Sequence, residues 1–178
     1  MAASLSLNGN SNLVLKLTEV PRYRIVAQVN SRVLAQVGPL IPGALSRHDD
    51  ELGREARGEF LLDTGAYGAM IDLAVAESLQ LRLQGSREVH GIHGYGWLQQ
   101  FLGRVSLPAF DDGGQSTLFT TVVECVAVPS LSAKNREHGV EVIGILGRMF
   151  LRDSRLTIDA IGGRVEIEIS ADAANGSR

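Results

Sequence analysis

The chain has 178 residues, of which 44% are hydrophobic and 21% charged, and its net charge at pH 7 is −3. This composition is typical of one globular domain with its own core, and the lack of a dense Lys/Arg block argues against a nucleic-acid binder. We expect neither a membrane segment nor a secretory signal, because no apolar run approaches the roughly 20 residues that span a bilayer and no basic stretch precedes an apolar one at the N-terminus. The single cysteine, Cys125, excludes an intrachain disulfide and a Cys-rich metal site, and a reducing, cytoplasmic setting is the expectation.

The first part of the chain predicts a hairpin followed by a loop. Period-two alternation in RYRIVAQV predicts a strand, and Asn30-Ser31 predicts a turn into RVLAQV, so that 22–37 forms the hairpin. The charged stretch 46–59 has no apolar stripe and predicts an exposed loop. The expected organisation is a flexible N-terminal segment, one domain and a flexible C-terminal tail: residues 1–20, 21–170 and 171–178.

Beyond residue 59 the sequence predicts mostly strands. Residues 71–81 predict a short helix with Asp72 as its N-cap, 148–153 predict one helical turn, and 129–139 predict a loop. The fold class is therefore all-β, meaning mainly β with one or two short helices. The predicted strands and hairpins are 60–62, a glycine-tipped hairpin at 87–107, 116–128, 140–146 and a hairpin at 155–169.

The segment FLLDTGA runs from a buried strand directly into an acid. Glycine lets the backbone approach closely at Gly65, the Thr64 hydroxyl can anchor a turn, and backbone N–H groups can hold the carboxylate oxygens of Asp63. A tight turn of this kind can place a carboxylate at the floor of a cleft. The alternative is an ordinary Asx-turn at the end of a strand, which is common.

A second segment, VIGILGRMFL, places Ile145 and Leu146 before Gly147 and Arg148, and by itself it also fits a core strand that ends at glycine. Together, LLDTGA and ILGRMFL resemble the two motifs of the retroviral-type (retropepsin-like) aspartic protease family, in the family's order. The glycine-rich HGIHGYGW lies between them, where that family has its flap, a hairpin that closes over substrate.

The resemblance implies a retropepsin-like acid protease barrel with one lobe per chain and no cofactor or metal. It implies an aspartic endopeptidase in which Asp63 is catalytic, within an active-site turn of Thr64, Gly65 and Ala66. The chemistry uses two carboxylates that share a proton, so a chain with one such turn is expected to act as a homodimer on a peptide or protein substrate. Expected substrate-binding residues of the flap and cleft walls are Ile92, His93, Gly94, Tyr95, Ile145 and Leu146, and Gly147 and Arg148 are expected to be structural.

The sequence departs from the family pattern in three places. Viral relatives often carry an acid just after the turn that pairs with the second-motif arginine; Tyr67 and Gly68 stand there, and Asp72 is a candidate partner for Arg148. The stretches 42–58 and 109–139 look like insertions. Ala66 matches the family motif but stands where two-lobed relatives often have a hydroxyl residue. Because the alanine side chain cannot donate to the carboxylate, we expect activity at mildly acidic rather than strongly acidic pH.

Other readings stay open at this point. Because the expected cleft walls Ile92, Ile145 and Leu146 are apolar, we expect substrates with apolar residues beside the scissile bond. Tyr95 and Trp97 fit substrate contact and packing on the sheet equally well. His90 and His93 are too few for a zinc site, and Cys125 is predicted to be a buried structural thiol.

The competing function is a non-catalytic dimeric peptide- or protein-binding module with the same fold. A latent enzyme that needs N-terminal processing is a third possibility.

Overall fold

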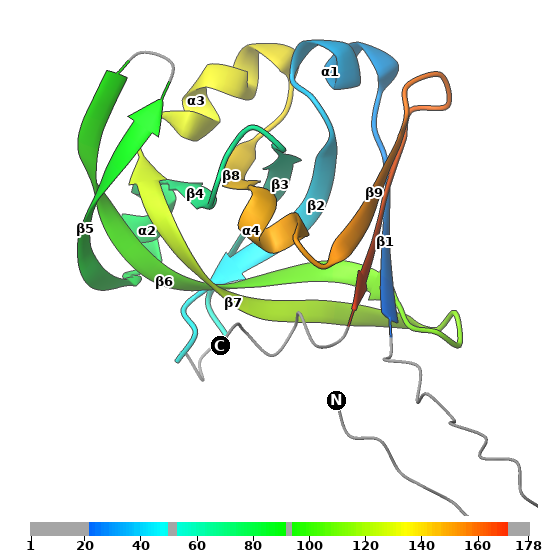
Figure 1. Cartoon of the computed structure of the whole chain (residues 1–178), viewed down its shortest axis with the longest axis horizontal. Helices are drawn as coiled ribbons and strands as arrows, with labels where there is room; N and C mark the ends of the chain where they lie inside the picture. The colour runs from blue at the N-terminus through cyan, green and yellow to red at the C-terminus, as the bar shows by residue number, and fades with distance from the viewer. Residues whose placement is uncertain (1–21, 50–52, 92–93, 171–178) are drawn as a thin grey trace, which may run out of the picture.

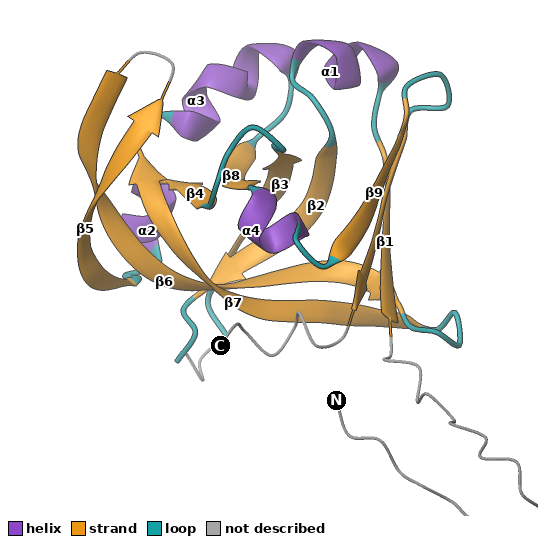
Figure 2. Cartoon of the chain, in the orientation of Figure 1, coloured by secondary structure: helices purple, strands orange, loops and turns teal. Residues whose placement is uncertain are grey.

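The computed structural model describes residues 22–49, 53–91 and 94–170 and shows a mainly-β barrel with short helices, which confirms the predicted fold class (Figures 1 and 2). The strands are β1 (Arg22–Gln28), β2 (Leu40–Ser46), β3 (Glu55–Leu62), β4 (Ala69–Asp72), β5 (Arg82–Gly91), β6 (Gly94–Phe110), β7 (Ser116–Val128), β8 (Val142–Leu146), β9 (Ser154–Asp159) and β10 (Arg164–Ser170). The helices are α1 (Ser31–Gln36), α2 (Leu73–Ser78), α3 (Leu131–Asn135), α4 (Arg148–Leu151) and the 3-10 turn η1 (Arg136–His138).

The described strands form one sheet in the order β2-β3-β8-β4-β7-β6-β1-β10-β9. β2 also pairs with β6, so the six strands from β2 to β6 in this order close on themselves. β5 pairs with β6 alone and extends from the barrel as a long hairpin (Figure 1). Closure of the barrel leaves β5 and β9 as the strands with a single partner in the described part of the chain.

The core fills the barrel with side chains from the inward-facing positions of most strands. Phe60, Leu107, Phe119 and Ile167 are fully buried there. The ring of Phe119 packs edge-on against Tyr23 at 5.4 Å and against Phe150 at 6.1 Å between ring centroids. This aromatic contact ties α4 to the barrel, and α4 is the helix that follows the second sequence motif.

Most of the strands predicted from alternation are present. The hairpin over 87–107 is confirmed as the paired β5 and β6, and the hairpin over 155–169 as β9 and β10. The short helix after Asp72 is confirmed as α2, and the Asp72 side chain accepts a hydrogen bond from the Ala74 N–H as a helix cap does.

Three predictions of local structure are wrong. Residues 31–36 form helix α1 instead of the second strand of a hairpin, because the Asn30 side chain caps the helix by accepting from the Arg32 N–H. β1 pairs with β10 and touches β6. The predicted loop at 129–139 contains α3 and η1, and the predicted loop at 46–59 contains the first half of β3.

About half of each stretch that looked like an insertion, 42–58 and 109–139, belongs to strands of the sheet. Residues 42–46 and 55–58 lie in β2 and β3, which pair with each other from Leu40↔Leu61 to Ser46↔Glu55. Residues 109–110 end β6, and residues 116–128 form β7. These two strands pair in the most extensive antiparallel ladder of the fold. The barrel would not close without them.

Candidate active site

The Asp63 turn and the second motif lie side by side because β3 and β8 run parallel. Leu61 pairs with Ile145 and Leu62 with Leu146, and the carboxyl ends of parallel strands meet at the same edge of a sheet. Asp63 and Gly147 therefore follow their strands at the same edge. The Asp63 N–H donates to the Leu146 carbonyl at 3.1 Å, which extends the ladder into the turn.

The turn at Asp63 is closed by its own backbone. The Gly65 N–H donates to Asp63 Oδ1 at 2.7 Å, and the Ala66 N–H donates to the Asp63 carbonyl at 3.2 Å. A Cβ atom at Gly65 would lie 3.0 Å from Asp63 Oδ1, so glycine allows the carboxylate to sit this close to the turn. This is an Asx-turn by geometry, and it leaves the side chain of Asp63 partly exposed.

The junction between β8 and α4 fixes the far side of the turn. The Arg148 N–H donates to the Ala66 carbonyl at 2.9 Å and the Met149 N–H to the Tyr67 carbonyl at 3.0 Å. A Cβ atom at Gly147 would lie 2.5 Å from the Gly68 carbonyl oxygen and 2.7 Å from that of Ala66, distances that real Cβ contacts do not reach. We call these two hydrogen bonds and the close approach at Gly147 the backbone clamp.

The expected partner of Arg148 is wrong. Asp72 is 2% exposed and accepts from the Ala74 N–H at 2.8 Å and from the Ser132 N–H and hydroxyl at 2.7 and 2.8 Å. Burial alone would raise the pKa of Asp72, but the hydrogen bonds from Ser132 and Ala74 hold it below the usual value. Arg148 instead makes a long 3.5 Å contact to the Thr64 carbonyl and forms no ion pair with the described residues.

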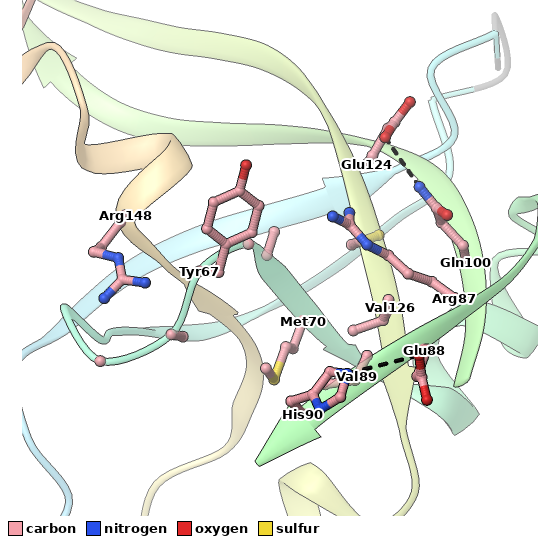
Figure 3. A pocket seen from close by; sticks show the side chains of 15 residues that line it. Tyr67, Met70, Arg87, Glu88, Val89, His90, Gln100, Glu124, Val126 and Arg148 are labelled. Carbon is pink, nitrogen blue, oxygen red and sulfur yellow. Dashed lines mark hydrogen bonds and ion pairs between the residues drawn. The ribbon is translucent and has the colours of Figure 1, made fainter. Parts of the chain in front are cut away.

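A cleft of about 330 Å³ opens beside the turn, between the segment Gly65–Met70, β5, β6 and β7 (Figure 3). Its apolar lining includes Met70, Val89 and Val126. Asp63 is not among the residues that line it, and the turn reaches the cleft through Gly65 and Ala66. The charged and polar side chains of this lining are Arg87, Glu88, His90, Gln100, Glu124 and Arg148.

A second hollow lies on the other side of Tyr67 and Arg148. It measures about 380 Å³, is mostly apolar, and is also lined by Thr64, Met149, Leu151 and Arg152. Tyr67 is 56% exposed and Met149 42% exposed. The Asp63 turn thus separates a cleft under the β5–β6 hairpin from an exposed apolar face.

The other predicted site residues are placed differently from one another. Ile92 and His93 lie outside the described residues, and the backbones of Gly94 and Tyr95 start β6, paired with Gly91 and His90. Ile145 packs in a small cluster with Leu40, Leu131 and Val142. Leu146 is 1% exposed in the main core, so its side chain does not line the cleft.

Three polar side chains that line the cleft were not predicted from the sequence. Arg87, Gln100 and Glu124 come from three strands and form no local motif. Only the register between β5, β6 and β7 brings them together, and the alternation of side chains along each strand is the signal that could have found them.

Cys125 is a buried structural thiol, as predicted. It is 1% exposed, its Sγ contacts the Phe101 carbonyl at 3.5 Å, and burial raises its pKa to about 12, with the Glu124 charge adding to the effect. Among the described residues no three His, Cys, Asp or Glu side chains gather as metal ligands would. Within the same residues no helix combines the length and apolar character needed to cross a membrane.

No protein-family model and no curated protein sequence matches the chain. Among solved structures, the chain is similar to an EIAV protease complexed with the inhibitor HBY-793. The two share 18% sequence identity, the match covers 66% of this chain and 90% of that one, and the TM-score is 0.33.

Proposed function

We propose that the protein is an aspartic endopeptidase that acts as a homodimer, with Asp63 of each protomer supplying one of the two catalytic carboxylates. The observation that supports this most strongly is the backbone clamp. It holds residues 66–68, which directly follow the Asp63-Thr64-Gly65 turn, through the hydrogen bonds from the Arg148 and Met149 N–H groups and the close approach at Gly147. The other end of the turn is fixed by the Asp63 N–H, which donates to the Leu146 carbonyl. An Asx-turn that only ended a strand would need no such support from a distant segment.

In the proposed reaction the two Asp63 carboxylates share one proton, because two like charges a few ångströms apart do not both ionise. The ionised carboxylate takes a proton from a water molecule that attacks the peptide carbonyl carbon. The protonated carboxylate donates to the carbonyl oxygen, and the pair titrates as a unit. The turn hydrogen bond from Gly65 orients Asp63 Oδ1 and leaves the rest of the carboxyl group for this exchange.

The need for a second chain follows from the chemistry and from the exposed face beside the turn. The only Asp-Thr-Gly in the sequence is at Asp63; Asp159 also opens a turn, but without the threonine. A two-fold interface brings the same residue of both protomers to one axis. The apolar hollow lined by Thr64, Tyr67 and Met149 directly adjoins the turn and suits a contact of this kind.

The β5–β6 hairpin is the proposed flap over an extended substrate. In this role its tip residues Ile92, His93, Gly94 and Tyr95 contact the peptide backbone, as expected from the family resemblance. The glycines around the tip, Gly91, Gly94 and Gly96, allow the hairpin to open and close.

The test compares the wild type with Asp63→Asn on an unfolded protein substrate, with the products read by mass spectrometry. Asp159→Asn is the matched control, because Asp159 is exposed and holds a turn of the same kind by accepting from the Ile161 and Gly162 N–H groups. We expect Asp63→Asn to lower the cleavage rate more than about a thousandfold and Asp159→Asn to leave it unchanged. We also expect the rate to peak above about pH 3 and to rise with the square of protein concentration at high dilution.

Equal cleavage by the wild type and Asp63→Asn would refute the proposal. Absence of cleavage by the wild type, together with retained peptide binding, would favour the non-catalytic binding module. Cleavage that appears only after removal of an N-terminal piece would identify a latent enzyme.

A further inference from the structure

The side chains that face the cleft from the hairpin and from β7 share one face of the sheet. Arg87 pairs with Leu98, and Gln100 lies two residues further along β6, so Arg87 and Gln100 point to the same side. Glu124 pairs with Leu102, which is again on that side. A cation, an amide and a carboxylate therefore line one wall of the cleft.

The guanidinium of Arg87 is held in place without a carboxylate partner. Its Cζ lies 5.8 Å from the centroid of the Tyr67 ring, in a cation–π contact across the cleft (Figure 3). No carboxylate of the described residues forms an ion pair with Arg87. Glu124, an acid on the same face of the sheet, accepts a hydrogen bond from Gln100 Nε2 at 2.9 Å.

The lining of the cleft also contains a second arginine and a second carboxylate. Arg148 lines the cleft near Tyr67 and has no ion pair with the described residues. Glu88 lies on the opposite face of β5 from Arg87 and faces His90, with 3.6 Å between Glu88 Oε2 and His90 Nε2. The cleft lining therefore holds two arginines that form no ion pair with the described residues and two carboxylates, Glu88 and Glu124, that already contact His90 and Gln100.

From this arrangement we infer that the cleft selects peptides with a glutamate or aspartate side chain, which Arg87 binds as an ion pair while Tyr67 holds the guanidinium flat. The planar fork of arginine matches the two oxygens of a carboxylate, and its stacking on Tyr67 reduces the freedom it loses on binding. The apolar side chains of Met70, Val89 and Val126, which line the same cleft, take the methylene part of the side chain. This inference deepens the proposed function by naming its substrate class.

The inference replaces the preference for apolar residues that the sequence suggested. That preference rested on Ile92, Ile145 and Leu146 as walls. Ile92 is outside the described residues, Leu146 is buried in the core, and Ile145 packs in the small cluster. The lining that the structure shows contains polar and charged side chains as well as the apolar Met70, Val89 and Val126.

The experiment measures binding, so that its result does not depend on catalysis. Fluorescein-labelled peptide pools that differ only in one fixed central residue (Glu, Gln, Leu or Lys) are titrated with Asp63→Asn, and anisotropy reports the affinity. We expect the Glu pool to bind about fivefold more tightly than the Gln pool at low salt, the size of an exposed ion pair, and the difference to shrink as salt is added. In the same background, Arg87→Gln should remove the difference and Arg87→Glu should reverse it in favour of the Lys pool.

Three further variants separate recognition of the peptide side chain from general effects on binding. Arg82→Gln removes an exposed arginine from the same strand at a position that does not line the cleft, and it should keep the Glu preference. Tyr67→Leu should weaken the preference and Tyr67→Phe should keep it, because the ring and not the hydroxyl holds Arg87. Equal binding of the Glu and Gln pools, a preference for the Lys pool, or equal behaviour of Arg87→Gln and Arg82→Gln would overturn the inference. A failure of Asp63→Asn to abolish cleavage would refute the proposed function and leave this result standing.

Discussion

Replacing Gly147 by alanine should break the backbone clamp. The added Cβ would lie 2.5 Å from the Gly68 carbonyl oxygen, 2.7 Å from the Ala66 carbonyl oxygen and 3.0 Å from the Ala66 carbonyl carbon. All three are backbone atoms, so no side chain can rotate away to make room. The turn that carries Asp63 must therefore move away from β8 or β8 must shift within the barrel.

The cost can be worked out from these contacts. Forcing a methyl group into a packed site costs about 1–3 kcal/mol. Displacing the turn also weakens the hydrogen bonds from the Arg148 and Met149 N–H groups, each worth about 1 kcal/mol. We expect Gly147→Ala to lower the free energy of unfolding by about 2–4 kcal/mol, a large part of the 5–15 kcal/mol that a domain has.

Urea unfolding followed by circular dichroism measures this difference, with an unchanged dependence on urea as the sign that both proteins unfold alike. Gly68→Ala is the matched control, because it adds the same methyl group to the facing segment, where no other atom lies within 4 Å. The control should stay within about 1 kcal/mol of the wild type. A Gly147→Ala protein as stable as Gly68→Ala would refute the reasoning that places the Asp63 turn under this clamp.

Two predictions concern buried titratable groups. The hydrogen bonds from Ser132 and Ala74 lower the pKa of Asp72 against the effect of burial, so the stability that Asp72 supplies is present above about pH 4 and is lost as the pH falls below it. Asp72→Asn should lower the free energy of unfolding by about 2 kcal/mol at pH 7 and flatten its decline in acid, measured by urea titrations; an unchanged decline would contradict this. Cys125, with its pKa raised to about 12, should resist iodoacetamide at pH 8 in the folded protein and react once urea unfolds it, as read by mass spectrometry. Rapid labelling of the folded protein would contradict its burial.

Strands with one buried face could be predicted from sequence, and elements without that pattern could not. β10 alternates buried Val165, Ile167 and Ile169 with charged residues, so its period of two is visible. Helix α1 was missed because asparagine uses the same side-chain hydrogen bond to start a turn and to cap a helix. The six residues that follow were too short a segment to show a helical period.

The first half of β3 shows how packing can erase the signal of a strand. Glu55 and Arg57 point outward, where they form an ion pair, and the inward positions beside them are Ala56, which packs against the core, and then Gly58. A Cβ atom there would lie 2.6 Å from Ile143 Cγ2 and 2.9 Å from the Glu141 carbonyl oxygen. Close packing of β3 on its neighbour requires a glycine where the pattern would need an apolar residue, and the segment therefore reads as a charged loop.

Helix α3 has no capping side chain that would mark its start in the sequence. Ser130 precedes it in a left-handed conformation, with φ of 59°, and its side chain makes no capping hydrogen bond. The helix is held by tertiary contacts instead, since the Ser132 N–H and hydroxyl bind the buried Asp72. A contact between residues 60 positions apart cannot be seen in the local sequence.

The same distinction explains why the turn at Asp63 could be located and the walls of the cleft could not. The turn carries its own geometry in four residues, through the hydrogen bond from Gly65 to Asp63. In β8, Leu146 packs in the main core and Ile145 in the small cluster, and neither side chain lines the cleft. In the described part of the chain β5 has only β6 as a partner, and its Arg87 lines the cleft. The Asp63 turn and the proposed peptide contact at Arg87 therefore lie on different strands. A change at Arg87 can alter the proposed substrate preference without disturbing the backbone clamp.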